Sequence, residues 1–298
     1  MRTSVALLAL LLTVHTEGNT SGHSWTYPEK GSQDRAAWSK DFPTCAGEKQ
    51  SPINIKTNDV WVNPFLKPLK LSGYDFQEGE FQMINNGHSG KTFDFCLTHK
   101  CCYKYPNDPW QKKRFPTLAL EEHLAIILIF ALPPQLHIVH YNSELYSSFE
   151  EAENKPHGLA VISVLIKAKK GKRNDYYEQL FSHLSQIGTE GENITLTYID
   201  VLHMLPHDYS NSYHYEGSLT TPPCTENVSW IVLEKIVTIS TKQLKKLQKS
   251  LTNNHNEIIQ KNFRETQPLN HRKVEANFLP KEGKQRKKGY PPGWSGMF

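Results

Sequence analysis

Apolar and polar positions alternate along several short runs of this chain, which is the pattern of half-buried β-strands. The runs are "FQMINNG" (81–87), "LHIVHYN" (136–142), "GLAVISVLIK" (158–167), "ITLTYIDVL" (194–202) and "SWIVLEKIVTIS" (229–240). Two other segments, 174–187 and 240–251, repeat apolar residues at helical spacing, and Ser240 or Thr241 caps the second. "LAIILIFALPP" (124–134) is short, ends in a proline pair and indicates a buried strand. The pattern predicts one mainly β domain with peripheral helices.

The first residues resemble a secretory signal peptide. Arg2 precedes an apolar run from Val5 to Val14, and small and polar residues follow. That run is too short to span a bilayer, which needs about 20 residues. We therefore expect a signal peptide at about 1–17, a secreted, extracellular protein without a membrane span, and a folded domain over 21–280.

The positive charge of the chain gathers in one segment. The formal net charge is +4, and residues 281–298 hold five Lys or Arg and one Glu, which is also +4. The remainder is therefore neutral, which argues against a nucleic-acid-binding face. We interpret 281–298 as a solvated, disordered basic tail.

Secretion would place the cysteines in an oxidising environment that favours disulfides. There are five cysteines, so at least one stays unpaired within a monomer. Asn193 ("NIT") and Asn227 ("NVS") lie in glycosylation sequons and are predicted to carry glycans.

The histidines of "LHIVHYN" are candidate metal ligands. Strand alternation sends His137 and Val139 to one face and Ile138 and His140 to the other. One histidine can thus point into a site while the other is buried or bonded behind it. A single histidine on a strand is more often a core residue than a metal ligand, so this string alone is weak evidence for a metal site.

Five strings together carry a resemblance to a known family. They are "QSPINI" (50–55), "NNGHS" (85–89), "LHIVHYN", "GLAVISVLIK" and "YEGSLTTPPCTENVSWIVL" (215–233), in this order. The combination resembles the α-class carbonic anhydrases, and the cysteines beside two of the strings resemble the secreted, salivary-type form. The resemblance runs from about Trp25 to Phe278, with a gap from about Gly90 to Gln135. It implies a single domain around a large, twisted, mostly antiparallel central sheet.

The resemblance also implies an activity: a zinc lyase that reversibly hydrates carbon dioxide to bicarbonate and a proton. His137 would be the third zinc ligand, Thr220 would orient zinc-bound hydroxide, and His88 would shuttle protons. Tyr27, Asn86 and Thr221 would order water or line the site. Carbon dioxide would rest on an apolar wall made of Val139, Val161, Leu219, Val228 and Trp230. Carbonic anhydrases are themselves the standard example of zinc lowering the pKa of bound water to about 7.

The resemblance further implies a disulfide between Cys45 and Cys224. Its Cα atoms should then lie about 4.4 to 6.8 Å apart. We expect Cys96, Cys101 and Cys102 not to share a metal site with His137.

The chain departs from the family where the other two zinc ligands belong. The family's His-X-His-Trp string is missing between "NNGHS" and His137. Gln135 stands where the family usually has a Glu bonded to a ligating histidine. Glu122 is a candidate, by local string only, for the Glu that orients the threonine hydroxyl.

Three interpretations of this departure remain open. The first is true loss of catalysis, as in carbonic anhydrase-related binding proteins. The second is replacement of the ligands by His99, Cys101, Cys102 or His123. The third is a shifted reading frame: one set of codons for "TLALE" (117–121), read one base later, encodes His-Leu-His-Trp. We accordingly expect 45–88 and 136–278 to form the sheet and the aberrant block 90–134 to be irregular. A zinc enzyme with impaired activity is the leading hypothesis, and a non-catalytic extracellular binding module is the alternative.

Overall fold

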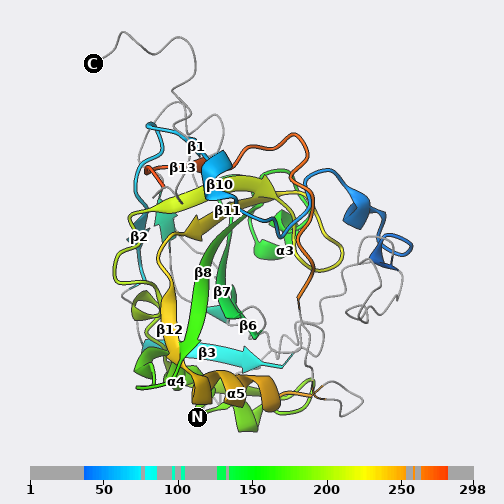
Figure 1. Ribbon diagram of the computed structural model, residues 1–298. Coiled ribbons are helices and arrows are strands. Elements are labelled where there is room, and N and C mark those ends of the chain that lie inside the picture. Colours follow the sequence, from blue (N-terminus) through cyan, green and yellow to red (C-terminus); the bar gives the residue numbers. More distant parts are fainter. Residues whose placement is uncertain are drawn as a thin grey trace, which may run out of the picture.

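The central element is an eight-stranded sheet with the order β1-β13-β10-β11-β8-β7-β6, to which β12 adds by pairing with β8 (Figure 1). The computed structural model describes residues 37–74, 78–85, 96–97, 102–104, 126–131, 134–252, 258 and 263–280. The strands are β1 (Trp61–Val62), β6 (Ile126–Ala131), β7 (Pro134–Tyr141), β8 (Leu159–Lys169), β10 (Ser212–Gly217), β11 (Val228–Leu233), β12 (Val237–Ser240) and β13 (Glu275–Ala276).

The sheet is of mixed direction, with antiparallel pairs in the majority. Four of its seven pairings are antiparallel, and the parallel ones join β1 to β13, β11 to β8 and β12 to β8. In Figure 1, β10 crosses the view while β8 runs down it, so the sheet is strongly twisted. The predicted fold class, mainly β around a large central sheet, is confirmed.

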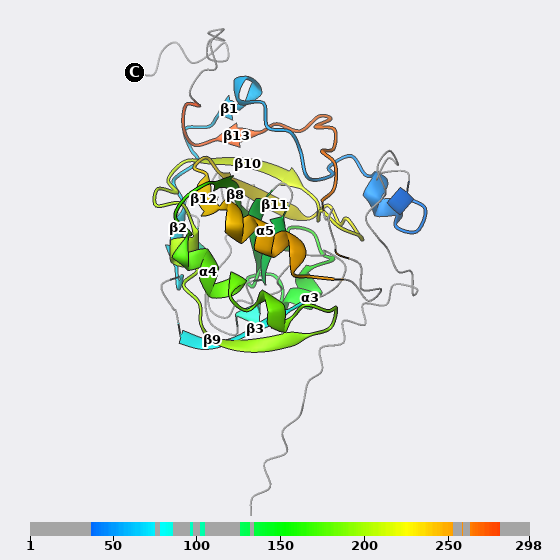
Figure 2. The same cartoon turned by 60° about the horizontal axis from the view of Figure 1, so that its bottom comes forward.

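Smaller elements cover this sheet. β3 (Glu78–Ile84) pairs with β4 (Cys96–Leu97) and β9 (Asn193–Tyr198), and β2 (Lys70–Ser72) pairs with β5 (Cys102–Lys104). The helices are α3 (Phe149–Ala152), α4 (Asp175–Phe181) and α5 (Thr241–Lys249), with 3-10 turns η1 (Pro43–Ala46), η2 (Thr57–Asp59), η3 (Leu184–Gln186) and η4 (Leu202–Met204). Figure 2 shows α4 beside α5, where Gln243 Nε2 donates to the Asn174 carbonyl at 2.7 Å. No helix in the described ranges is long and apolar enough to cross a membrane.

The two faces of β7 enter two separate apolar clusters. Ile138 belongs to the larger cluster, together with side chains of α4 and α5, and Val139 belongs to the smaller one on the opposite face. His140, on the face of Ile138, is hydrogen-bonded to the Tyr74 hydroxyl at 2.6 Å. The predicted alternation, with one histidine bonded behind the other, is therefore confirmed.

β6 corrects one prediction and confirms another. It pairs with β7 along its whole length, from Ile126 opposite Val139 to Ala131 opposite Pro134. The expectation that 90–134 is irregular is therefore wrong for 126–131, whereas a strand is present within 124–134, as predicted. The physical reason is the run "IILIFA", which is rich in Ile and Phe, residues that favour strands, and which extends the described sheet beyond β7. Within 90–134 the structure otherwise describes only β4, β5 and Pro134, the first residue of β7, and the rest of that block lies outside the described residues.

Candidate functional site

His137 lies in the middle of β7, between two paired strands. Its register partners are Ser163 of β8 and Leu128 of β6. Its side chain is buried, and burial lowers its pKa to about 3, so the imidazole is neutral at physiological pH. The ring meets Trp230 edge to face, with centroids 4.9 Å apart.

A cavity of about 300 Å³ opens beside His137. The sheet contributes Gln135, His137, Ser163, Leu165, Tyr215, Trp230 and Val232, and loops contribute Pro52, Ile53, Asn54, Ile55 and Thr266. None of these described lining residues is charged. The cavity therefore combines apolar side chains with neutral hydrogen-bonding groups.

The residues predicted to form the carbon dioxide wall come together in the structure. Val139, Val161, Val228 and Trp230 are buried members of the smaller cluster, and the partly buried Leu219 packs against it. Val139 and Val161 are register partners on β7 and β8. This wall and the cavity extend from His137 in opposite directions along β7.

Thr220 and Thr221, both partly buried, lie in the loop between β10 and β11. The start of that loop is fixed by reciprocal bonds: Ser51 N–H donates to Ser218 Oγ at 2.9 Å, and Ser218 N–H donates to Ser51 Oγ at 3.1 Å. Its far end is closed by the Cys224 N–H, which donates to the Thr221 carbonyl at 2.9 Å. The loop is thus held by the segment around Ser51. This role of Ser51 and Ser218 was not predicted from the sequence, although both residues lie inside the strings quoted above.

The predicted disulfide is confirmed. Cys45 and Cys224 are bonded, their Cα atoms are 4.9 Å apart, and both are fully buried. Around it, Arg264 donates to the Cys45 carbonyl at 2.9 Å and to Gln50 Oε1 at 2.7 Å. The bridge therefore anchors the N-terminal segment to the loop that carries Thr220.

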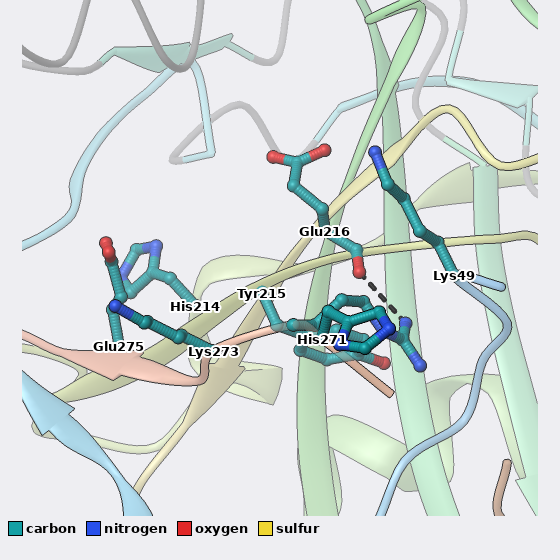
Figure 3. A pocket seen from close by; sticks show the side chains of 8 residues that line it. Lys49, His214, Tyr215, Glu216, His271, Lys273 and Glu275 are labelled. Carbon is teal, nitrogen blue, oxygen red and sulfur yellow. Dashed lines mark hydrogen bonds between the residues drawn. The ribbon is translucent and has the colours of Figure 1, made fainter. Parts of the chain in front are cut away.

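A second cavity, of about 310 Å³, lies at the junction of β10 and β13 (Figure 3). Its lining is Lys49, His214, Tyr215, Glu216, His271, Arg272, Lys273 and Glu275. The Arg272 guanidinium donates to the Glu216 and Leu269 carbonyls at 3.0 and 3.1 Å and lies over the Tyr215 ring. Side chains of both charge signs line this cavity, and its arginine is bonded to backbone carbonyls.

Several predicted site residues lie outside the described residues. These are Tyr27, Asn86, His88 and Glu122, and also the alternative ligands His99, Cys101 and His123. The side chains of Cys96 and Cys102 are not described either. Within the described part of the chain, no group of three or more His, Cys, Asp or Glu side chains could hold a metal ion. The described residues alone therefore do not form a zinc site around His137.

The two sequons differ in accessibility. Asn193 is exposed at the start of β9. Asn227 is buried, and its Nδ2 donates to the carbonyls of Ala152, Glu153 and Lys155 at 3.2, 2.8 and 2.8 Å. A glycan would replace one of the two hydrogens on that nitrogen, so at most one N–H would remain for the three carbonyls. We therefore withdraw the prediction for Asn227 and keep it for Asn193.

Sequence comparison identifies the family. A family model described as eukaryotic-type carbonic anhydrase matches residues 33–118 and 126–278. The chain belongs to this carbonic anhydrase family. It is 40% identical to carbonic anhydrase 6 of Homo sapiens over 92% of this chain and 91% of the relative. Carbonic anhydrase 6 of Bos taurus is also 40% identical, over 92% and 86%, and carbonic anhydrase 12 of Homo sapiens is 34% identical, over 92% and 80%.

The extent of the carbonic anhydrase match corrects the gap inferred from the strings. The family match continues to residue 118 and resumes at 126, so it leaves only 119–125 between its two segments. The gap from about Gly90 to Gln135 was therefore too wide. A comparison by short identical strings does not detect similarity that is spread over scattered single positions, whereas a family model does.

Proposed function

We propose that this chain is a secreted carbonic anhydrase-family protein whose hydration of carbon dioxide at zinc is impaired or lost. Hydration of carbon dioxide is the activity of the family. The observation that carries the proposal is that no group of three or more His, Cys, Asp or Glu side chains in the described part of the chain could hold a metal ion. The sequence agrees, because no two of its 14 histidines are separated by a single residue, as the family's first two ligands are.

Loss of two imidazoles removes most of the affinity of such a site for zinc. Protein zinc sites hold the ion through three or four ligands in a fixed tetrahedral arrangement, and one ligand supplies only a fraction of that binding. The apolar wall and the anchored Thr220 loop support descent from a carbon dioxide-hydrating protein. Secretion is supported by the signal-like N-terminus and by the buried disulfide.

A second candidate function is a non-catalytic extracellular binding module on the same fold. The packing around His137 favours it. The ring contacts Trp230 within an ordered central sheet, so the fold around this residue is maintained without a second ligand among the described residues.

Zinc content and hydration rate, measured on the same preparation, test the proposal. We expect the full chain to hold no stoichiometric zinc and to hydrate carbon dioxide at the background rate in stopped-flow assays. One tightly held zinc per chain with robust hydration would overturn the proposal and would point to His99 or His123 as further ligands.

Replacement of residues within 90–135 identifies the cause of the expected loss of zinc binding and hydration. Exchanging residues 90–135 for the corresponding segment of an active family member should restore both zinc and hydration. The triple variant Thr117→His, Ala119→His, Leu120→Trp should not, because ligand identity without the correct strand register does not rebuild the site. Sequencing the transcript separates a shifted frame, which requires two compensating changes around residues 90 and 135, from an intact frame.

A further inference from the structure

The cavity beside His137 is separate from the apolar wall assigned to carbon dioxide. Of the wall residues, only Trp230 also lines the cavity. The cavity instead lies toward Gln135 and Leu165, a pair of register partners, and is covered by the loop 52–55. A ligand here would therefore contact His137 and Trp230 but none of the other described residues assigned to the hydration reaction.

Ser163 is an unusual residue at this position. It interrupts the apolar run "LAVISVLI", and only 3% of its surface is exposed, yet its hydroxyl makes no hydrogen bond with any described residue. Its Oγ is not among the fully buried polar atoms that lack a partner, so it is open to the cavity, where a ligand group could bond to it. The Gln135 carboxamide, on the neighbouring strand, likewise makes no hydrogen bond in the described part of the chain, and both residues line the cavity.

The remaining lining restricts the chemistry of a ligand. No Asp, Glu, Lys or Arg is among the described lining residues, so an ionised ligand would lose its hydration without gaining a counter-charge. Tyr215 and Trp230 stack with their ring centroids 6.0 Å apart and 6° between their planes, and this stacked pair forms an aromatic wall of the cavity. Ile53 and Ile55 line the cavity from the covering loop. A hydroxyl and a carboxamide each donate and accept hydrogen bonds.

We propose that this cavity binds a small neutral ligand with a flat apolar body and an amide-like donor–acceptor pair, which Ser163 and Gln135 recognise. The flat body packs between the aromatic wall and the covering loop. A volume of about 300 Å³ is at the small end of ligand sites and limits the ligand to roughly one ring with a substituent. Binding of this kind requires no zinc, so its test is independent of the hydration measurements.

Benzamide, titrated into the full chain and followed by ligand-observed NMR and calorimetry, tests this assignment. We expect saturable binding with one site per chain. Benzoate, which has the same shape and a charge, should bind at least tenfold more weakly, and toluene, which lacks the polar pair, should also bind more weakly.

Variants locate the site. Ser163→Ala should weaken benzamide binding about fivefold, and Ser163→Leu, which fills the cavity, should abolish it. Ser229→Ala is the matched control, because Ser229 lies on β11 but bonds to Glu216 Oε1 at 3.2 Å and does not line the cavity. The affinity of the Ser229→Ala variant for benzamide should equal that of the natural chain.

Two results would overturn the assignment. One is the absence of saturable benzamide binding to the natural chain, and the other is binding that Ser163→Ala and Ser163→Leu leave unchanged. Thermal unfolding of each variant verifies its fold. If Ser163→Leu does not fold, Ser163→Ala, which adds no volume, decides the question alone.

Discussion

At the scale of single residues, burial alone keeps His214 uncharged. His214 lies on β10 with 1% of its surface exposed, and its Nε2 lies 2.8 Å from Ser212 Oγ. Desolvation lowers its pKa to about 3, whereas an unfolded histidine has a pKa of about 6.5. Between about pH 3 and pH 6.5, His214 therefore binds a proton in the unfolded chain but not in the folded chain. The contribution of His214 to stability is complete above pH 6.5 and is lost as the pH falls toward 3.

His214→Gln should reduce the acid sensitivity of folding. For pKa values of about 3 and 6.5, one histidine removes roughly 2 kcal/mol of unfolding free energy between pH 7 and pH 5. The variant should lose less stability than the natural chain over this interval, by about that amount, in urea unfolding followed by tryptophan fluorescence. His207→Gln, which changes an exposed histidine, is the control and should follow the natural chain. Equal pH dependence in all three proteins would refute the role assigned to His214.

The two sequons give a second prediction at this scale. When the protein is expressed through a mammalian secretory pathway, Asn193→Ala should remove the mass of one glycan and Asn227→Ala should remove none. Asn227→Ala should instead lower the unfolding free energy by about 1–3 kcal/mol, because three carbonyls lose their donor. Intact mass spectrometry and urea unfolding measure the two effects. A glycan on Asn227 in the folded, secreted protein would contradict the burial argument.

At the scale of elements, the end of β10 depends on a glycine. A Cβ on Gly217 would lie 2.2 Å from Ser51 Oγ and 2.8 Å from Trp230 Cδ1. This close approach allows the loop that carries Thr220 to lie against the segment around Ser51. No other residue type could keep these two segments at this separation.

Gly217→Ala should therefore destabilise the protein by about 1–3 kcal/mol, the usual cost of overpacking a filled site. Gly188→Ala is the matched control, because its nearest atom, the Ser250 carbonyl oxygen, is 3.5 Å away. Thermal and urea unfolding of the two variants give the comparison. A Gly217→Ala protein as stable as the control would show that the loop has room to move.

Strands and helices were predictable from the sequence where neighbouring residues alone determine them. The alternation in "LHIVHYN" and "GLAVISVLIK" correctly predicted β7 and β8, and Ser240 caps α5 with the expected side-chain bond to the Gln243 N–H at 3.2 Å. The helix expected over 174–187 is divided. α4 ends at Phe181, and the His183 N–H then bonds to the Leu180 carbonyl in a tighter turn.

Pairing between distant strands was not predictable from these patterns. The parallel contacts of β8 with β11 and β12 join segments far apart in sequence, and local periodicity contains no information on such partners. The same limit applies to the cavity: Ser163, Gln135 and the loop 52–55 meet only through the sheet order. The wall residues and the disulfide were predictable because the family resemblance supplied the long-range information.

At the scale of the whole molecule, one covalent bond closes most of the chain into a loop. Cys45 and Cys224 are separated by 179 residues, and breaking the bond gives the unfolded chain much more freedom. Cys45→Ala combined with Cys224→Ala should lower the unfolding free energy by about 2–4 kcal/mol. Dithiothreitol should lower the midpoint of urea unfolding for the natural chain and leave that of the double variant unchanged. An identical response of both proteins would mean that the bridge contributes nothing to stability.

The same bridge determines what a protease can release from this protein. A single cut anywhere between residues 45 and 224 leaves two polypeptides that remain covalently joined. The cut protein would keep its intact mass on a non-reducing gel and separate into fragments only after reduction. In a fluid that contains proteases, the two fragments of a molecule cut once would thus stay covalently joined. The joining bond lies at the loop that carries Thr220.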